Sequence, residues 1–278
     1  MITVRWILCL LGCLWAQAAE KNPLTVRMLS EMSQISAGQT FWVGFLLKHP
    51  PGYHTYWKHP GVIGVATNIT WQLPAGFTAG ETVWPAPQKV MMSIHRAQGY
   101  RDDTLLMVPI TAPANLTGES VTLRAQLDWM SCHQSCHPAH AVPFSLTIMT
   151  GREARVDETN APLFAQARAA VPESDARWLC KATIRDQQIL LTVAPAPGNL
   201  RRIEDLGEIW FFSDDGAIDS STPQVLSRLP NGSFQLAMQR YEFGPRNITR
   251  LSGVLQASKG WAAEGKKTCI SIDVTTEE

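Results

Sequence analysis

The chain has 278 residues, and its 24 basic residues are balanced by 24 acidic residues, which gives a formal net charge of zero. Such a chain offers no broad positive surface to a phosphate backbone, so we do not expect it to bind nucleic acid. Its length is enough for two hydrophobic cores of ordinary size, and we therefore expect two domains.

The first 18 residues have the pattern of a secretory signal peptide. A basic residue, Arg5, precedes the apolar stretch 6–15, and the small residues Ala16 and Ala18 fit a signal-peptidase site. We expect cleavage after Ala18 and an exported, soluble protein, because no later segment has the roughly 20 consecutive apolar residues of a membrane-spanning helix. The run Leu-Leu-Gly-Cys13 also resembles a bacterial lipobox, so lipid anchoring at Cys13 is the alternative.

Short strand-like segments dominate residues 19–150, the expected first domain. Apolar and polar residues alternate along 121–129 and again along 142–148, so that every second side chain faces a core. Turns rich in proline and glycine separate the segments, which is the pattern of a β-sandwich. The predicted strands of this domain are 40–47, 68–73, 104–110, 121–129 and 142–148.

The composition changes at residues 151–172, which we interpret as a linker with a short helix. The segment 161–170 is rich in helix formers and has Pro162 in its first turn. Strand signals return in residues 173–278 and predict a second domain that is all-β and sandwich-like. Its predicted strands are 178–184, 189–193, 208–212, 233–238, 251–255 and 268–273.

The expected mature chain contains four cysteines, because the other two belong to the signal peptide. Disulfides persist in the oxidising compartments that exported proteins enter, and four cysteines allow three connectivities. The sequence positions favour Cys132 with Cys136, which are close together, and Cys180 with Cys269, which lie in apolar strand-like runs of the second domain. We interpret the second pair as a buried structural disulfide.

We expect the reactive site of the protein in one run of residues that connects two predicted strands. This run is Asp-Trp-Met-Ser-Cys132-His-Gln-Ser-Cys136-His-Pro-Ala-His140. A disulfide between such close cysteines closes a small ring, which adds little stability and favours exchange. His133, His137 and His140 lower a nearby thiol pKa when they are protonated. The pair differs from a thioredoxin site, where the spacer has two residues and opens a helix. We therefore expect a redox-active pair.

Three other interpretations of this loop stay open. In the first, the cysteines form a static structural disulfide. In the second, the thiolates and imidazoles bind zinc or copper. In the third, the run is a haem-attachment site, although it has one residue more between its cysteines than the usual motif. Metal binding is also an alternative earlier in the chain, at Met91, Met92 and His95. Methionines in such a position either bind a soft metal or pack against other apolar side chains. We expect packing there, and no metal or other cofactor.

Six segments of the sequence match one exported family. They are 52–61 (Gly-Tyr-His-Thr-Tyr-Trp-Lys-His-Pro-Gly), 69–74, 84–87 (Trp-Pro-Ala-Pro), 128–138 with the two cysteines and a following proline, 164–170 and 211–219. Together they resemble the N-terminal periplasmic region of the DsbD family of thiol:disulfide interchange proteins, in particular its ScsB-like branch. The resemblance covers most of the expected mature chain, and the cysteine run is its most specific part.

The resemblance implies an immunoglobulin-like β-sandwich in the first domain and an oxidoreductase activity of the protein-disulfide reductase type. It implies that Cys136 forms the mixed disulfide with partner proteins and that Cys132 resolves it. Tyr53 and Tyr56 match aromatic residues that pack near the pair, and the segment 88–100 matches the loop that caps it. A mobile cap fits this chemistry, because a reduced pair must be shielded until its partner arrives.

The resemblance also implies a location and partners for the protein. Family members relay electrons in the periplasm, from a membrane-embedded domain to disulfide proteins. Their full-length chains continue into that membrane domain and into a thioredoxin-like domain, neither of which is found in these 278 residues. We therefore expect a separately encoded membrane electron carrier of the DsbD or CcdA type, and periplasmic thioredoxin-like disulfide proteins as the other partners.

Overall fold

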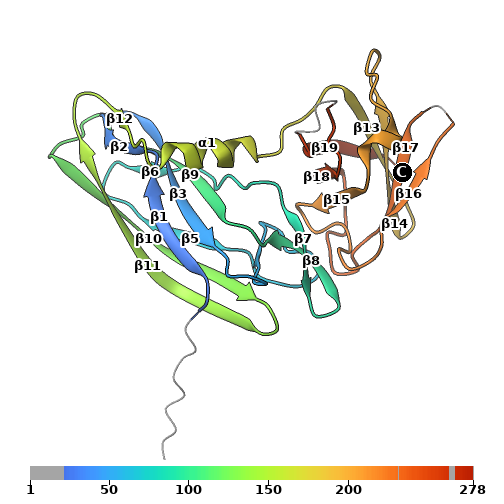
Figure 1. Ribbon diagram of the computed structural model, residues 1–278, viewed down its shortest axis with the longest axis horizontal. Helices are drawn as coiled ribbons and strands as arrows, with labels where there is room; N and C mark the ends of the chain where they lie inside the picture. Colours follow the sequence, from blue (N-terminus) through green and yellow to red (C-terminus); the bar gives the residue numbers. More distant parts are fainter. Residues whose placement is uncertain (1–21, 231, 263–266, 278) are drawn as a thin grey trace, which may run out of the picture.

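The computed structural model describes residues 22–230, 232–262 and 267–277. Within these residues the chain is nearly all β, as predicted, with one α-helix, α1 (Ala161–Ala169), and a short 3-10 helix, η1 (Ile203–Leu206). The strands form an N-terminal lobe, β1 to β12, and a C-terminal lobe, β13 to β19, which lie side by side (Figure 1). The predicted signal peptide and the lipobox at Cys13 lie outside the described residues.

The N-terminal lobe is an immunoglobulin-like sandwich of two sheets with a small third sheet beside it. One sheet has the order β1-β3-β9-β6, the facing sheet has the order β12-β2-β11-β10-β5, and the small sheet has the order β4-β8-β7. The strands are β1 (Thr25–Ser30), β2 (Met32–Ile35), β3 (Thr40–Lys48), β4 (Thr55–Tyr56), β5 (Asn68–Gln72), β6 (Thr78–Ala79), β7 (Gln88–Met92), β8 (His95–Tyr100), β9 (Thr104–Thr111), β10 (Ser120–Cys132), β11 (Cys136–Thr150) and β12 (Arg155–Val156). The predicted strands of the first domain correspond to β3, β5, β9, β10 and β11.

The two large sheets enclose one hydrophobic core, to which every second residue of a strand contributes. In β10, the side chains of Leu123, Ala125 and Leu127 are at most 2% exposed, as the alternating pattern predicts. Across the core, Phe45 of one sheet meets Phe144 of the other edge to face, with 5.7 Å between ring centroids. The alternation that is visible in the sequence therefore marks the inner face of the sandwich.

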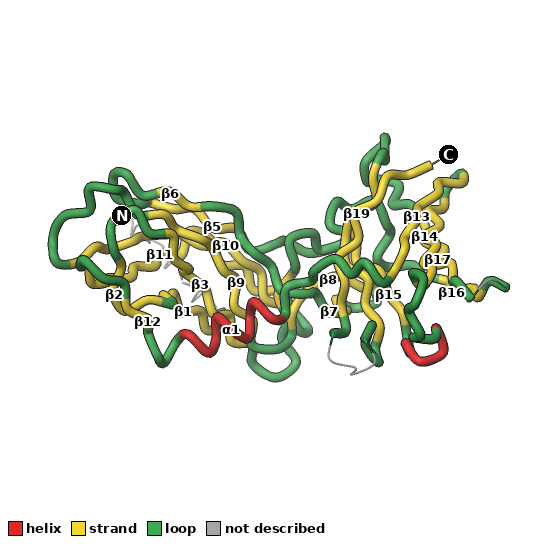
Figure 2. The backbone as a smooth tube through the Cα atoms, turned by 90° about the horizontal axis from the view of Figure 1, so that it is seen from above, coloured by secondary structure: helices red, strands yellow, loops and turns green. Residues whose placement is uncertain are grey.

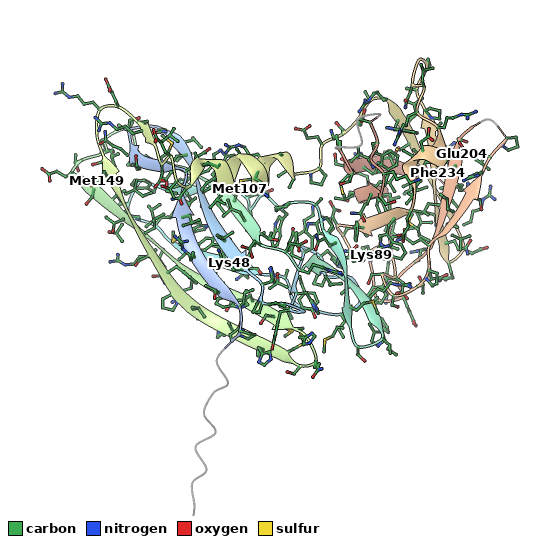
Figure 3. The ribbon with its side chains drawn as sticks, in the orientation of Figure 1. Lys48, Lys89, Met107, Met149, Glu204 and Phe234 are labelled. Carbon is green, nitrogen blue, oxygen red and sulfur yellow. A yellow bond between two sulfur atoms is a disulfide. The ribbon has the colours of Figure 1, made fainter. Side chains whose placement is uncertain are left out.

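Helix α1 covers the outer face of the sheet that contains β9 (Figure 1, Figure 2). Pro162 stands at the start of the helix, where the backbone needs no amide donor. Phe164 is fully buried in a cluster with Leu105 and Met107 of β9, and Figure 3 shows Met107 close to the helix. The predicted helix is confirmed. Among the described residues, no helix is long and apolar enough to cross a membrane.

The C-terminal lobe consists of seven strands in the order β15-β18-β19-β13-β14-β17-β16. They are β13 (Trp178–Arg185), β14 (Gln188–Pro195), β15 (Ile209–Ser213), β16 (Val225–Arg228), β17 (Phe234–Gln239), β18 (Arg250–Ala257) and β19 (Cys269–Glu277). They enclose a second core, where Trp178 and Trp261 meet edge to face at 5.1 Å and Phe234 is fully buried (Figure 3). Each of these strands except β16 was predicted from the sequence.

The two lobes are in direct contact through hydrophobic side chains. Trp210 and Phe212 of β15 and Val254 of β18 belong to the same buried cluster as the core of the N-terminal lobe. Strands β7 and β8 of the N-terminal lobe lie beside β15 in both views (Figure 1, Figure 2). The small β4-β8-β7 sheet therefore occupies the junction between the lobes.

Candidate redox site

The two closely spaced cysteines face each other at the tip of the long β10–β11 hairpin. Cys132 is the last residue of β10 and Cys136 is the first residue of β11, and the strand register pairs them directly. Their sulfur atoms form a disulfide, and their Cα atoms are 4.2 Å apart. The predicted pairing of Cys132 with Cys136 and its position between two strands are confirmed.

Strand alternation points the disulfide away from the sandwich core. Trp129 of β10 faces the core, so that Cys132, three residues later, lies on the opposite face. A β-bulge between Leu127 and Trp129 brings both Val142 and Ala139 of β11 against the core, although they are three positions apart and would face opposite sides in a regular strand. The bulge thus sets the register that places the cysteines opposite each other on the outer face.

A small hydrophobic cluster, separate from the main core, surrounds the disulfide. Tyr56, Val90 and Ala97 are buried in it with Cys132, and the partly buried members are Ile63, Met92, Met130 and Cys136. The Tyr56 hydroxyl donates a hydrogen bond to the Cys132 Sγ atom at 3.2 Å. Burial raises the pKa of Tyr56, so that this hydroxyl stays protonated and remains a donor at neutral pH.

His54, the residue before strand β4, pairs with Cys132 through backbone hydrogen bonds. The backbone N–H and C=O groups of His54 and Cys132 exchange two hydrogen bonds, each 2.9 Å long. The His54 side chain is 4% exposed, and its Nε2 atom has no hydrogen-bond partner among the residues that the structure describes. Burial lowers the pKa of His54 to about 4, with smaller contributions from His49, Arg101 and His133. The imidazole beside the pair is therefore neutral at pH 7.

The two cysteines differ in their exposure to solvent. The Cys132 side chain is completely buried, whereas that of Cys136 is half-buried. The Cys136 Sγ atom contacts the Met92 Sδ atom at 3.6 Å. Cys136 is therefore the more accessible cysteine of the pair, and Met92 covers part of its sulfur.

The segment 88–100, which the resemblance identifies as a cap, forms the β7–β8 hairpin rather than an irregular loop. Met92 and Met91 point to opposite sides of it: Met92 packs on Cys136, and the Met91 side chain is 48% exposed. The hairpin turn contains Ser93 with a positive φ of 55° and no glycine, so that the usual sequence signal of a tight hairpin is missing. We call β7–β8 the cap hairpin below.

The histidines of the cysteine run lie around the tip of the β10–β11 hairpin. The rings of His133 and His137 flank Tyr53, at 5.4 and 5.9 Å between centroids, so that Tyr53 lies beside the tip as expected. His140 is turned outward and pairs with Asp128 at 2.5 Å. Among the described residues, no group of three or more His, Cys, Asp or Glu side chains is arranged to hold a metal ion.

Asn22 is a residue of the site that sequence reasoning missed. Its Oδ1 atom accepts hydrogen bonds from the indole N–H of Trp129 and the hydroxyl of Ser131, and its Nδ2 group donates to the His137 carbonyl at 2.6 Å. It thereby ties the two strands of the cysteine hairpin together. These contacts span more than 100 residues of sequence, and no local pattern reveals them.

The expected disulfide between Cys180 and Cys269 is not formed, and both residues are free thiols. Strands β13 and β19 are neighbours, but their parallel register pairs Ala182 with Thr276. Extension of this register leaves Cys269 about 16 Å along the strand from the level of Cys180, well beyond the Cα separation of a disulfide. Burial raises the pKa of Cys180 to about 11 and also raises that of Cys269. The prediction of a structural bond was wrong.

Comparisons with known proteins agree with this geometry. Residues 22–147 match the family described as thiol:disulfide interchange protein DsbD, N-terminal. The crystal structure of the N-terminal periplasmic domain of ScsB from Proteus mirabilis is 18% identical, covers 92% of this chain and 94% of its own, and superposes with a TM-score of 0.65.

Other similarities are weaker. An Escherichia coli adhesin, FdeC, is 12% identical over 92% of this chain and 66% of its own, but its TM-score of 0.23 is too low to indicate a common fold. A comparison with curated proteins gives no match. Residues 22–147 therefore belong to the family of DsbD N-terminal domains, and the chain has the fold of the ScsB periplasmic domain.

Proposed function

We propose that this protein is a thiol:disulfide interchange module that passes reducing equivalents between proteins through Cys132 and Cys136. The observation that carries the proposal is the asymmetry of this disulfide: Cys132 is buried and its sulfur accepts a tyrosine hydroxyl, whereas Cys136 is half-buried and its sulfur contacts Met92 of a hairpin. Membership of residues 22–147 in the DsbD N-terminal family supports the same activity. A disulfide that serves stability alone needs neither a donor at one sulfur nor a cover on the other.

The two sulfurs have different roles in the exchange. The Cys136 thiolate attacks a partner's disulfide, so that a Cys136–partner bond forms and the partner's other sulfur leaves as a thiolate. The Cys132 thiolate then attacks the Cys136 Sγ atom, the mixed bond breaks, and the partner departs with both sulfurs reduced. Two electrons have passed from the pair to the partner. The same steps in reverse reload the pair from a donor dithiol.

Tyr56 assists the step in which Cys132 carries negative charge. When a donor thiolate attacks Cys136, Cys132 is the leaving group, and a hydrogen bond to a developing thiolate favours its departure. The Tyr56 hydroxyl already lies 3.2 Å from this sulfur, so no rearrangement is required. His54 does not supply a positive charge that would stabilise the Cys132 thiolate, because its lowered pKa keeps the imidazole neutral at pH 7.

The proposal includes a location and partners. We place the protein in the periplasm after removal of residues 1–18, with a membrane electron carrier of the DsbD or CcdA type as donor and thioredoxin-like disulfide proteins as acceptors. We divide the chain into a redox domain, 19–150, a linker with the helix, 151–172, and a second β domain, 173–278. The ScsB structure, described as a periplasmic domain, supports the location, and the C-terminal lobe's own hydrophobic cluster around Trp178 and Phe234 supports the division.

The roles of the two cysteines are tested by trapping. In the Cys132→Ala variant a mixed disulfide at Cys136 has no resolving thiol, so adducts with thioredoxin-like proteins accumulate in periplasmic extracts and are identified by mass spectrometry. The Cys136→Ala variant leaves only the buried Cys132 thiol and accumulates none. Cys180→Ala is the matched control, because it removes a free thiol of the other lobe and behaves like the unmodified protein. Equal trapping by both single variants contradicts the assignment of roles, and trapping by neither contradicts the function.

A further inference from the structure

The cap hairpin has two faces, and one of them covers the disulfide. In its register Val90 pairs with Ala97 and Met92 pairs with His95, so Val90, Met92 and Ala97 lie on one face. Val90 and Ala97 are buried in the cluster around Cys132, and Met92 contacts Cys136. This face of the hairpin is the cover of the redox pair.

The opposite face of the cap hairpin lies against the C-terminal lobe. Met91 pairs with Arg96 and Lys89 pairs with Gln98, which places these side chains on the second face. The Lys89 Nζ atom is 4.9 Å from the centre of the Trp210 ring, and the Arg96 guanidinium is 5.7 Å from it. Lys89 also pairs with Glu208, and Figure 3 shows Lys89 at the junction of the two lobes. Two cations of the hairpin thus meet one indole ring of β15.

Hydrogen bonds also join the cap hairpin to the C-terminal lobe. The Gln98 side chain is 3% exposed, and its Nε2 group donates to the carbonyl oxygens of Ser213, at 2.8 Å, and His59, at 2.7 Å. The Ser220 hydroxyl donates to the Arg96 carbonyl at 2.9 Å and accepts the backbone N–H of Val62 at 3.0 Å. Two of these bonds, Gln98 to Ser213 and Ser220 to Arg96, link the cap hairpin to the C-terminal lobe, and both are lost if the hairpin leaves that lobe.

Backbone from both lobes comes close at this junction. Gly216 of the C-terminal lobe has a φ of 76°, and a Cβ atom there would lie 2.3 Å from the His59 imidazole. Gly61 of the N-terminal lobe has a φ of 91°, and a Cβ atom there would lie 2.1 Å from the Ser220 hydroxyl. Both positions therefore need glycine, and the two surfaces fit together without intervening space.

We infer that the C-terminal lobe positions the cap hairpin over Cys136, with Lys89 and Arg96 against Trp210 as the positioning contacts. The inference gives the second lobe a role in the proposed redox function, on which it rests. The hairpin leaves Cys136 only if these contacts break or if the C-terminal lobe moves with it. Access of a partner to Cys136 is therefore controlled by a contact between the lobes.

The inference is tested with the double variant Lys89→Ala/Arg96→Ala in the full chain. After reduction, the rate at which iodoacetamide modifies Cys136 is measured by peptide mass spectrometry. We expect modification to be about fivefold faster or more, because two cation–π contacts that hold the hairpin are lost. Removal of two positive charges by itself disfavours the thiolate and slows modification, so a faster rate reports opening of the cap.

Two further variants separate positioning from general damage. Lys181→Ala/Arg250→Ala removes one lysine and one arginine from exposed ion pairs of the C-terminal lobe, with Glu277 and Asp273, and leaves the rate unchanged. Lys89→Arg/Arg96→Lys keeps both cations over the indole ring and restores a rate near that of the unmodified protein. Urea unfolding of all three variants shows whether each is folded under the conditions of the measurement.

The result that overturns the inference is an unchanged or slower rate in a folded Lys89→Ala/Arg96→Ala protein. An equal acceleration in the Lys181→Ala/Arg250→Ala control also overturns it, because the effect is then general loosening. Alkylation measures access to Cys136 whether or not the pair has a protein partner. The inference therefore fails independently of the trapping experiment, which alone tests the proposed function.

Discussion

The N-terminal and C-terminal lobes each contain two cysteines, but only the N-terminal pair is bonded. Cys132 and Cys136 end and begin adjacent strands of one hairpin, so local register brings them together. Cys180 and Cys269 lie on neighbouring parallel strands at different levels and remain free. Disulfide formation in this protein thus follows strand register rather than the number of cysteines in a lobe.

The surroundings of the two pairs also differ in a way that matters for reactivity. The N-terminal pair has a hydroxyl donor at Cys132 and a partly accessible sulfur at Cys136. Burial raises the pKa of both C-terminal thiols, which keeps them protonated and unreactive. One chain therefore contains a bonded pair with one half-buried cysteine and two free thiols whose pKa is raised by burial.

The largest expected effect is in alkylation of the C-terminal lobe. A rise in the pKa of Cys180 from 9.0 to about 11 reduces its thiolate fraction at pH 8 by about a hundredfold. We expect Cys180 in the folded protein to react with iodoacetamide at least about a hundredfold more slowly than in the urea-unfolded chain. Peptide mass spectrometry over time measures this, and its rate should rise with pH up to about 11. Similar rates in the folded and the urea-unfolded protein contradict the conclusion that burial keeps the Cys180 thiol unreactive.

A smaller effect is expected on stability when the protein is reduced. Within the described part of the chain the Cys132–Cys136 bond is the only disulfide, with a sequence separation of 4, and such a short ring contributes about 2 kcal/mol to the free energy of unfolding. Urea unfolding with and without dithiothreitol measures the difference. A second bond between Cys180 and Cys269 would close a loop of about 90 residues and add about 4 to 5 kcal/mol. A loss of that size on reduction shows that the C-terminal cysteines are bonded.

The smallest expected effect concerns the donor at Cys132. The Tyr56→Phe variant removes the hydroxyl that hydrogen-bonds to Sγ, and hydrogen bonds to charged groups contribute about 1.5 to 3 kcal/mol. Part of this is lost in the transition state, so we expect reduction by dithiothreitol to be about tenfold slower. Tyr53→Phe is the matched control, because its ring contacts His133 and His137. Equal rates for Tyr56→Phe and the unmodified protein rule out a role for the hydroxyl.

Patterns that repeat within a few residues predicted much of the structure. Alternation along 121–129 predicted β10 and its buried face, and Pro162 with its helix-forming neighbours predicted α1. The cap hairpin was not recognised as two strands, because its turn contains Ser93 with positive φ where glycine or asparagine is usual. The sequence also drew attention to His140, whereas the structure places His54 beside Cys132.

The amino-acid sequence by itself determined the strands with clear periodicity, the helix and the pairing of Cys132 with Cys136, because side-chain periodicity and a short loop are local properties. Only the tertiary structure decided that Cys180 and Cys269 stay apart, that the Tyr56 hydroxyl donates a hydrogen bond to Cys132, and that the cap hairpin contacts the C-terminal lobe. These arrangements join residues that are distant in the chain: Gln98 binds the carbonyl of Ser213, 115 residues away. Such contacts arise from sheet packing and register, and no local pattern encodes them.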